Sequence, residues 1–342
     1  MSHQLGSICD LRYNAASCLR KKMKKYLFSA LAMASVGLTS VAHASFELLL
    51  VADQGDGAAG SSRIHRFDPQ SRAYLGSFGS GVLTAVVSVT VDQTAGLAYV
   101  KDVNGYHAFD YSTGNHLRHI ATNNEFYNNY IRLIGGYLVG TGLGTPRLEI
   151  STSNLVTLPT PNNGYSLSVA PAPGSTAYVT EYTVGSTNRL YRYNPSTNAY
   201  TLLGSAATNS AYYSDGITLG RFRGGPGAAV VYGRGGDGDL GYWQLNAAGS
   251  VVSNNNVNLN AINSVFGLAN AHDGLFALGR LATDVTKYGI TYVSSQGTEF
   301  TTFGTSFLTK PISMASVVAP EPGTLLALGA GLVALVRRRR NR

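Results

Sequence analysis

Apolar and polar residues alternate from Arg63 to Phe78, and the alternation is interrupted once, at Asp68-Pro69-Gln70-Ser71. Alternation with a period of two predicts β-strands, and an interruption rich in Asp, Pro and Ser predicts a tight turn. The segment is therefore expected to be a β-hairpin. The same pattern predicts further hairpins at 105–117, 147–156, 189–203, 242–251 and 288–300.

One position in the turn has the same chemistry in every predicted hairpin. It is occupied by Asp68, Asp110, Ser151, Asn194, Asn246 and Ser294. Short polar side chains of this kind accept hydrogen bonds from backbone N–H groups two residues further on, which stabilises a turn. We therefore expect a structural role for all six residues rather than a row of catalytic acids.

These turn positions are 42, 41, 43, 52 and 48 residues apart, and a second pair of strands precedes each hairpin, for example at 88–100 and 167–179. Four strands in 40 to 50 residues is the period of a propeller blade. We expect an all-β propeller of six blades, or seven if the interval 199–241 hides a degenerate one. An irregular β-sandwich or a solenoid is the rival fold. The pattern resembles NHL-type and lactonase-like propellers in architecture only.

The two ends of the repeat region are out of phase with it. The segment Phe46–Asp53 resembles the second strand of a unit whose first strand is missing, and Lys310–Val317 resembles a lone first strand. Pairing of the two segments would complete the first blade and leave no open edge. We therefore predict that the C-terminal strand closes the ring.

The formal charge of +8 comes from the ends of the chain. Eleven of the 26 basic residues lie before residue 45 or after residue 336, which leaves 15 basic and 16 acidic residues in the body. A neutral body excludes nucleic acid as a partner. Both cysteines, Cys9 and Cys18, also lie outside the body, so it has no disulfide and no thiolate metal site.

The N-terminal part of the chain has the features of a secretory signal. Met23-Lys24-Lys25 opens a short basic region, an apolar run extends to Val41, and Ala42-His43-Ala44 places small residues before a cleavage site. We expect signal peptidase and the secretion machinery to act on residues 23–44, with cleavage between Ala44 and Ser45. The run is short and weak for a membrane anchor, the alternative. Residues 1–22 are expected to be a mis-annotated or disordered extension.

The C-terminal part, residues 318–342, follows the propeller domain assigned to residues 45–317. It begins with Pro320-Glu321-Pro322, continues with 13 mostly apolar residues from Thr324 to Val336, and ends with Arg337, Arg338, Arg339 and Arg340. The apolar residues predict a short transmembrane helix of about 20 Å. The arginines are expected to remain cytoplasmic, where they stop transfer through the inner membrane.

This arrangement resembles the PEP-CTERM sorting domain of Gram-negative bacteria, although Gly323 stands where the family more often has Ser or Thr. An ordinary tail anchor is the alternative. The resemblance implies recognition by an exosortase, cleavage near Pro320-Glu321-Pro322, transient anchoring in the inner membrane and delivery to the cell surface or the extracellular matrix. It also implies an association with exopolysaccharide.

The body contains little recognisable chemistry. Asp237 and Asp239 lie in a glycine-rich loop and are the best candidates for a Ca²⁺ site, although a tight turn is the more ordinary interpretation; the segment 53–57 is a similar and weaker candidate. His65 and His107 occupy similar places in two units and are expected on strand surfaces. No cofactor, Gly-x-Ser-x-Gly elbow or phosphate-binding loop is predicted.

Two functions follow from these features. The first is a non-enzymatic surface or matrix protein whose propeller binds exopolysaccharide or another protein. The alternative is a propeller hydrolase or lyase, possibly calcium-dependent, with its site at the central channel. That alternative needs acids from different blades, namely Asp53, Asp102, Glu181 and Asp215, to converge on the axis.

Overall fold

The alternating segments of the sequence form strands throughout the computed structural model. It describes residues 47–58, 60–122, 130–183, 188–206, 212–219, 229–234, 240–271, 274–294, 298–299 and 301–318. Its 24 elements are all β-strands, and residues Glu47–Val318 form one compact unit. Within these ranges there is no helix that is long and apolar enough to cross a membrane. The predicted transmembrane helix lies outside the described residues.

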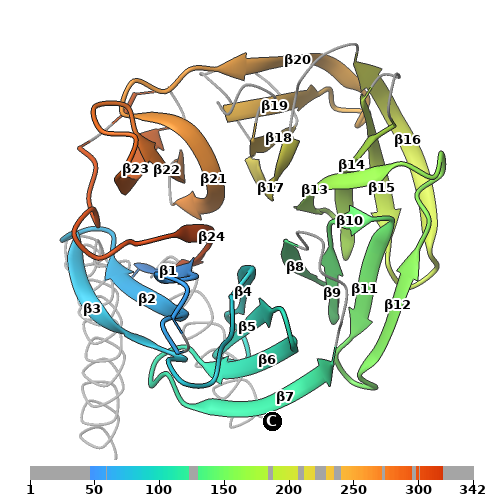
Figure 1. The fold of residues 1–342 in the computed structure, drawn as a ribbon. Helices are drawn as coiled ribbons and strands as arrows, with labels where there is room; N and C mark the ends of the chain where they lie inside the picture. Colours follow the sequence, from blue (N-terminus) through green and yellow to red (C-terminus); the bar gives the residue numbers. More distant parts are fainter. Residues whose placement is uncertain are drawn as a thin grey trace, which may run out of the picture. The chain divides into compact units, whose positions relative to one another are not determined.

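The strands form five sheets that surround a central axis as the blades of a propeller (Figure 1). Two blades come from the first part of the chain. The first blade contains β24 (Pro311–Val318), β1 (Glu47–Asp53), β2 (Arg63–Asp68) and β3 (Ala73–Phe78), and the second contains β4 (Ser88–Asp92), β5 (Leu97–Asp102), β6 (Gly105–Asp110) and β7 (His116–Thr122). The third contains β8 (Ile131–Ile134), β9 (Tyr137–Gly140), β11 (Thr145–Glu149) and β12 (Asn154–Leu158).

The fourth blade is a nine-stranded sheet. It contains β13 (Tyr165–Ala172), β14 (Thr176–Tyr182), β15 (Asn188–Asn194), β16 (Ala199–Ala206), β17 (Tyr212–Leu219), β18 (Ala229–Arg234), β19 (Leu240–Leu245) and β20 (Val251–Val257), with β10 (Gly142–Leu143) paired to β13. The fifth blade contains β21 (Ile262–Ala271), β22 (Gly274–Leu281) and β23 (Tyr288–Ser294).

The prediction of six or seven blades is therefore wrong, and the count is five. The reason lies between the fourth and fifth repeat units of the sequence. Their inner strands, β13 and β17, pair in parallel, with Ser168 opposite Ser214 and Val169 opposite Asp215. This pairing joins two four-stranded units into one sheet. The all-β class and the propeller arrangement are confirmed.

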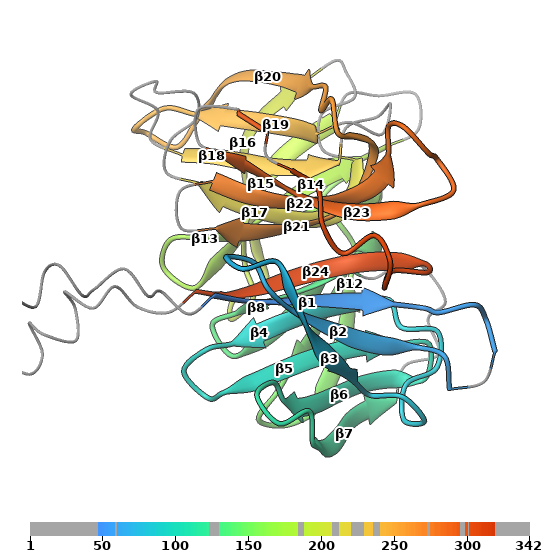
Figure 2. The ribbon, with the colours of Figure 1, turned by 90° about the vertical axis from the view of Figure 1, so that its left-hand side faces the viewer.

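The ring closes as predicted. Strand β24 pairs antiparallel with β1 over its whole length, from Glu47 opposite Val318 to Asp53 opposite Pro311. Figure 2 shows the two strands side by side although they come from opposite ends of the described chain. Because β24 is the inner strand of the first blade, the closing pair removes what would otherwise be two open edges.

The inner strands of neighbouring blades are parallel to one another. Ser88 Oγ and Thr90 Oγ1 of β4 accept hydrogen bonds from the N–H groups of Ile131 and Leu133 of β8, at 3.0 and 3.3 Å. This matched order is that of parallel neighbours, like β13 and β17. The C-terminal ends of the inner strands therefore share one face of the ring, and Val318 lies at this face.

The hydrophobic core lies between neighbouring blades. One cluster joins Leu48 and Leu50 of β1 to Val89, Val100 and Phe109 of the second blade. Equivalent clusters fill the other junctions, and one packs Tyr178 against Trp243 within the nine-stranded sheet. Both faces of each blade are thus covered, which accounts for middle strands that are buried at almost every position, such as β6.

The structure confirms a turn-stabilising acceptor at five of the six positions, with the predicted bond from two residues further on at Asp68, Asp110 and Asn194 and a bond from four residues further on at Asn246 and Ser294. The side-chain oxygens of Asp68, Asp110, Asn194, Asn246 and Ser294 each accept at least one backbone N–H bond of the turn, at 2.8 to 3.2 Å. Ser151 does not. The Ser151 hydroxyl donates to Glu149 instead. Glu149 is the last residue of its strand and pairs with Asn154 across the turn, and Asp68 pairs with Ala73 in the same way, so Glu149 is the residue equivalent to Asp68. The predicted alignment of this unit was wrong by two residues.

Candidate functional site

The inner strands enclose a cavity of about 250 Å³ near the axis. Its lining combines aliphatic side chains with neutral polar ones and one guanidinium group. The residues come from all five blades and are Thr90, Val91, Gln93, Arg132, Leu133, Pro171, Leu268, Ala269, Asn270, Met314, Ala315 and Ser316. None of these described lining residues is acidic or a histidine, so the cavity presents hydroxyl and amide groups rather than proton-transfer groups.

Arg132 holds the inner strands together. It lies on β8 and is only 6% exposed. Its Nη2 donates to the carbonyl of Leu268 on β21 at 2.9 Å, and its Nη1 lies 3.5 Å from the carbonyls of Val89 on β4 and Met314 on β24. The guanidinium group is therefore used to tie four blades together across the axis.

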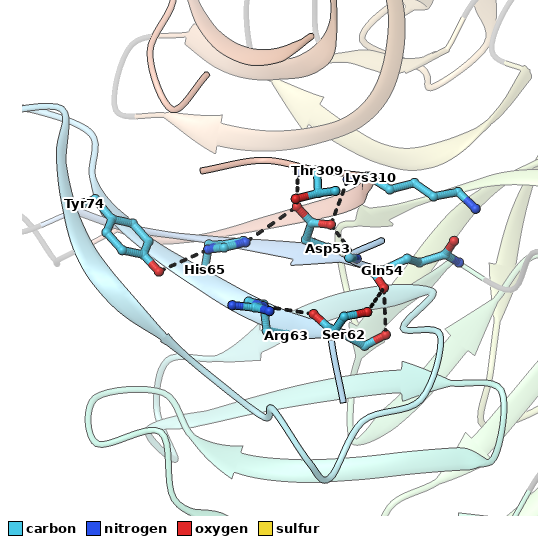
Figure 3. Close-up of polar contacts among 10 residues, drawn as sticks. Asp53, Gln54, Ser62, Arg63, His65, Tyr74, Thr309 and Lys310 are labelled. Atoms are coloured by element: carbon cyan, nitrogen blue, oxygen red, sulfur yellow. Dashed lines mark hydrogen bonds and ion pairs between the residues drawn. The ribbon is translucent and has the colours of Figure 1, made fainter. Parts of the chain in front are cut away.

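Asp53, at the end of β1, holds the loop that leads into the closing strand (Figure 3). It is 1% exposed. Its Oδ1 accepts the N–H groups of Gly55 and Lys310 at 2.7 and 2.8 Å, and its Oδ2 accepts that of Thr309 at 2.7 Å. His65 Nε2 lies 3.5 Å from Oδ2. Burial tends to raise the pKa of Asp53, but the bonds from His65 and the backbone outweigh it and lower the pKa.

Asp102 has the same role at the end of β5. Its Oδ1 accepts the N–H groups of Asn104 and Gly105 at 2.8 and 2.9 Å, and its Oδ2 accepts that of Thr84, in the loop before β4, at 2.9 Å. His107 Nε2 lies 3.3 Å from Oδ1. Burial again tends to raise the pKa of Asp102, but the bonds from His107 and the backbone outweigh it, so the pKa is lowered.

Glu181, near the end of β14, repeats this arrangement in the fourth blade. Its Oε1 accepts the N–H groups of Asn162 and Gly164, in the loop before β13, at 2.9 and 3.3 Å. The Tyr191 hydroxyl donates to Oε2 at 3.1 Å. Burial acts to raise the pKa of Glu181, and bonds from Thr160 and Asn162 lower it overall. All three acids therefore fasten the loop that enters the inner strand of their own blade.

The residue that contacts each acid lies at an equivalent place on the next strand. It is two positions beyond the register partner of the acid, and the three residues are His65, His107 and Tyr191. In each of these three blades, an aromatic or imidazole side chain of the outer strand contacts the residue on the middle strand. His65 Nδ1 lies 3.3 Å from the Tyr74 hydroxyl, His107 Nδ1 lies 3.3 Å from His116 Nε2, and Tyr191 packs edge-on against Tyr200.

This pattern corrects the expectation that His65 and His107 lie on strand surfaces. They are 4% and 6% exposed, and both are paired with a buried carboxylate. The reason is that β2 and β6 are middle strands, and a neighbouring blade covers each of their faces. The sequence signal that could have located the pairs is the repeated acid at the end of the preceding strand.

The acids proposed for a catalytic centre do not act together in this structure. Asp53, Asp102 and Glu181 each have their partners within their own blade, and Asp215 lies on β17 with a side chain outside the described part. Within the described ranges, no group of three or more His, Cys, Asp or Glu side chains could hold a metal ion. The geometry of these three acids gives the hydrolase or lyase alternative no support.

The other predicted site residues lie outside the described residues. They are the calcium candidates Asp237 and Asp239, the signal cleavage residues Ala42, Ala44 and Ser45, the motif Pro320, Glu321 and Pro322, and the arginines 337–340.

Comparison with protein families decides the nature of the C-terminal segment. Residues 318–340 match the PEP-CTERM protein-sorting motif. The chain carries a PEP-CTERM sorting signal. This motif is the recognition signal of exosortases, so it marks an exported protein that is processed at its C-terminus and delivered to the surface. A search of curated proteins found no match to the chain.

Solved structures with a similar fold are themselves propellers. TolB from Acinetobacter baumannii has a TM-score of 0.56 and 13% identity, over 79% of this chain and 66% of that one. A protein of unknown function from Bacteroides caccae has a TM-score of 0.53 and 15% identity, over 80% and 99%. A chain of a nidogen/laminin complex has a TM-score of 0.53 and 11% identity, over 79% and 98%. Identities this low indicate the shared fold alone.

Proposed function

We propose that this protein is a non-enzymatic binding and structural propeller of the cell surface or extracellular matrix of a Gram-negative bacterium, where it associates with exopolysaccharide. The observation that carries the proposal is the match of residues 318–340 to the PEP-CTERM sorting motif. The hydroxyl and amide groups that line the axial cavity support a binding role, because such groups recognise ligands without reacting with them, and the Arg132 guanidinium is already bonded to backbone carbonyls.

The proposal includes the steps of export. Signal peptidase cleaves between Ala44 and Ser45, and the chain is then anchored transiently in the inner membrane with Arg337 to Arg340 on the cytoplasmic side. Exosortase cleaves near Pro320-Glu321-Pro322 and releases residues 45–317 as the mature domain. The sequence features of both ends support this order.

Retention on the exopolysaccharide of the host tests the proposal. The purified protein is passed over immobilised polysaccharide, with the heat-unfolded protein as the control. We expect the folded protein to be retained and the unfolded protein to pass. Equal elution of the folded protein from polysaccharide and from blank resin would refute the association with exopolysaccharide.

A further inference from the structure

A second cavity, of about 440 Å³, opens between the second and third blades. Asp92, Tyr99 and Arg118 line one side, from β4, β5 and β7. The other side is formed by Tyr137 at the start of β9, Glu149 at the end of β11, and residues 135–136 and 150–151 of the two adjoining turns. We call this cavity the interblade groove. Its volume is in the range of pockets that bind small ligands.

The interblade groove lies at the face where the described chain ends. Asp92 is the last residue of β4, and Leu133 of the lining is near the end of β8. Since the inner strands run in the same direction, these residues share a face with Val318, the last residue of β24. Gly135 and Gly136 form the tight turn at the rim, with φ of 54° and 86°, and a Cβ on Gly136 would meet nothing within 4 Å. The space beside Gly136 is therefore free, whereas Gly135 packs against Ser175.

Two carboxylates are held in place within the groove. Asp92 Oδ1 accepts the N–H of Ala95 at 3.0 Å. Glu149 accepts the hydroxyl groups of Ser151 and Thr152 at 3.2 and 2.9 Å. Each carboxylate has about four lone-pair positions, so each keeps acceptor capacity for a ligand after these bonds. Because the turns fix both side chains, binding costs little additional rotamer entropy.

The remaining groups complete a surface that suits a sugar. Arg118 is exposed and supplies donors, and Leu133 and Ile150 supply apolar contact. Tyr137 is half-buried, with the Arg147 guanidinium 5.1 Å from its ring centroid. Burial and the nearby charge of Asp92 raise the pKa of Tyr99, so its phenol stays protonated. Acceptors, donors and apolar contacts thus converge on one volume, as a ring with several hydroxyl groups requires.

The charge of the groove selects among saccharides. Asp92 and Glu149 against Arg118 leave one net negative charge among the ionic residues that line it. A carboxylate-bearing sugar would face repulsion, whereas an ammonium group would be attracted. We propose that the interblade groove binds a polysaccharide segment built from hydroxyl- and amino-bearing sugars, and that it discriminates against uronic acids. This inference rests on the proposed association with exopolysaccharide and names its ligand class.

Calorimetric titration of the full-length protein in detergent tests the assignment. The probes are chitosan oligosaccharides and alginate oligosaccharides of equal length. Two variants, Asp92→Asn and Glu149→Gln, remove one charge each and keep a side-chain oxygen for the turn bonds. Asp284→Asn is the matched control, since Asp284 caps an exposed turn of the fifth blade in the same way. Thermal unfolding midpoints equal to wild type identify variants that are correctly folded.

We expect wild type to bind chitosan more tightly than alginate, and each groove variant to lose about tenfold in chitosan affinity, the effect of one charge-assisted hydrogen bond. Asp284→Asn should bind as wild type. Unchanged chitosan affinity in both groove variants, or a preference for alginate, overturns the assignment of this ligand to the interblade groove. Neither result affects the proposed association with host exopolysaccharide, which is tested separately by retention. Failure of the wild-type protein to bind these probes and the host polysaccharide overturns both proposals together.

Discussion

At the scale of single residues, the molecule depends on buried carboxylates that close loops. Asp53, Asp102 and Glu181 are at most 1% exposed, and their oxygens accept backbone N–H groups of the loops and turns beside them. A buried N–H group without an acceptor is costly, so these acids have a structural role in the fold.

Asp102→Ala tests this role. The change leaves the N–H groups of Thr84, Asn104 and Gly105 without their acceptor, and we expect the free energy of unfolding to fall by about 2–4 kcal/mol. Urea denaturation measures the loss. Asp110→Ala, which removes an exposed turn acceptor in the same blade, is the control and should lower the urea midpoint much less. Equal effects of the two substitutions would contradict the account.

The same carboxylates predict the acid limit of stability. Because their folded pKa values are lowered, their contribution is complete above the ordinary carboxyl pKa of about 4 and is lost as the pH falls through the lowered values. The urea midpoint should be nearly constant from pH 7 to pH 5 and should fall below about pH 4. A midpoint that drops between pH 7 and pH 6 instead would show that other groups dominate.

At the scale of strands and turns, local patterns predicted most of the fold. The hairpin at Arg63–Phe78 and the closing pair of β1 and β24 were found as expected, because period-two alternation and turn residues are local properties. The merging of two units through β13 and β17 was not predicted, because a parallel pair between consecutive inner strands depends on how closely two blades approach.

The candidate site was less predictable than the fold. Alternation alone does not indicate that His65 and His107 are buried, because it reports on one covered face and middle strands have two. The interblade groove was missed for a similar reason. Asp92, Arg118 and Glu149 lie far apart in the sequence and meet only where two blades pack together.

The closing strand provides a test at this scale. A chain that stops after Lys310 lacks β24 and leaves the edge of β1 open, whereas a chain that stops after Ala319 keeps the pair. We expect the shorter chain to lose its cooperative thermal transition and to aggregate, since an unpaired inner edge invites intermolecular pairing. The longer chain should unfold in one transition near that of the full protein, as monitored by circular dichroism. Equal transitions would mean that closure is dispensable.

At the scale of the whole molecule, the strand that closes the ring and the segment that carries the sorting signal are adjacent in sequence. Strand β24 ends at Val318, and the PEP-CTERM motif spans 318–340. The proposed cleavage near Pro320-Glu321-Pro322 is therefore only a few residues from the last strand, without a linker. The ring can close only after β24 has been exported, because β1 pairs with the last strand of the domain. Closure and C-terminal processing are thus expected at the same late stage of export.

Intact-mass spectrometry of the protein from a host with and without its exosortase decides whether the C-terminal segment is a processed sorting signal. We expect a wild-type product that begins at Ser45 and ends close to Pro320-Glu321-Pro322. In the strain without exosortase, the product should retain Arg342 and remain in the membrane fraction. A wild-type product that still ends at Arg342, or identical masses from the two strains, would refute processing by exosortase.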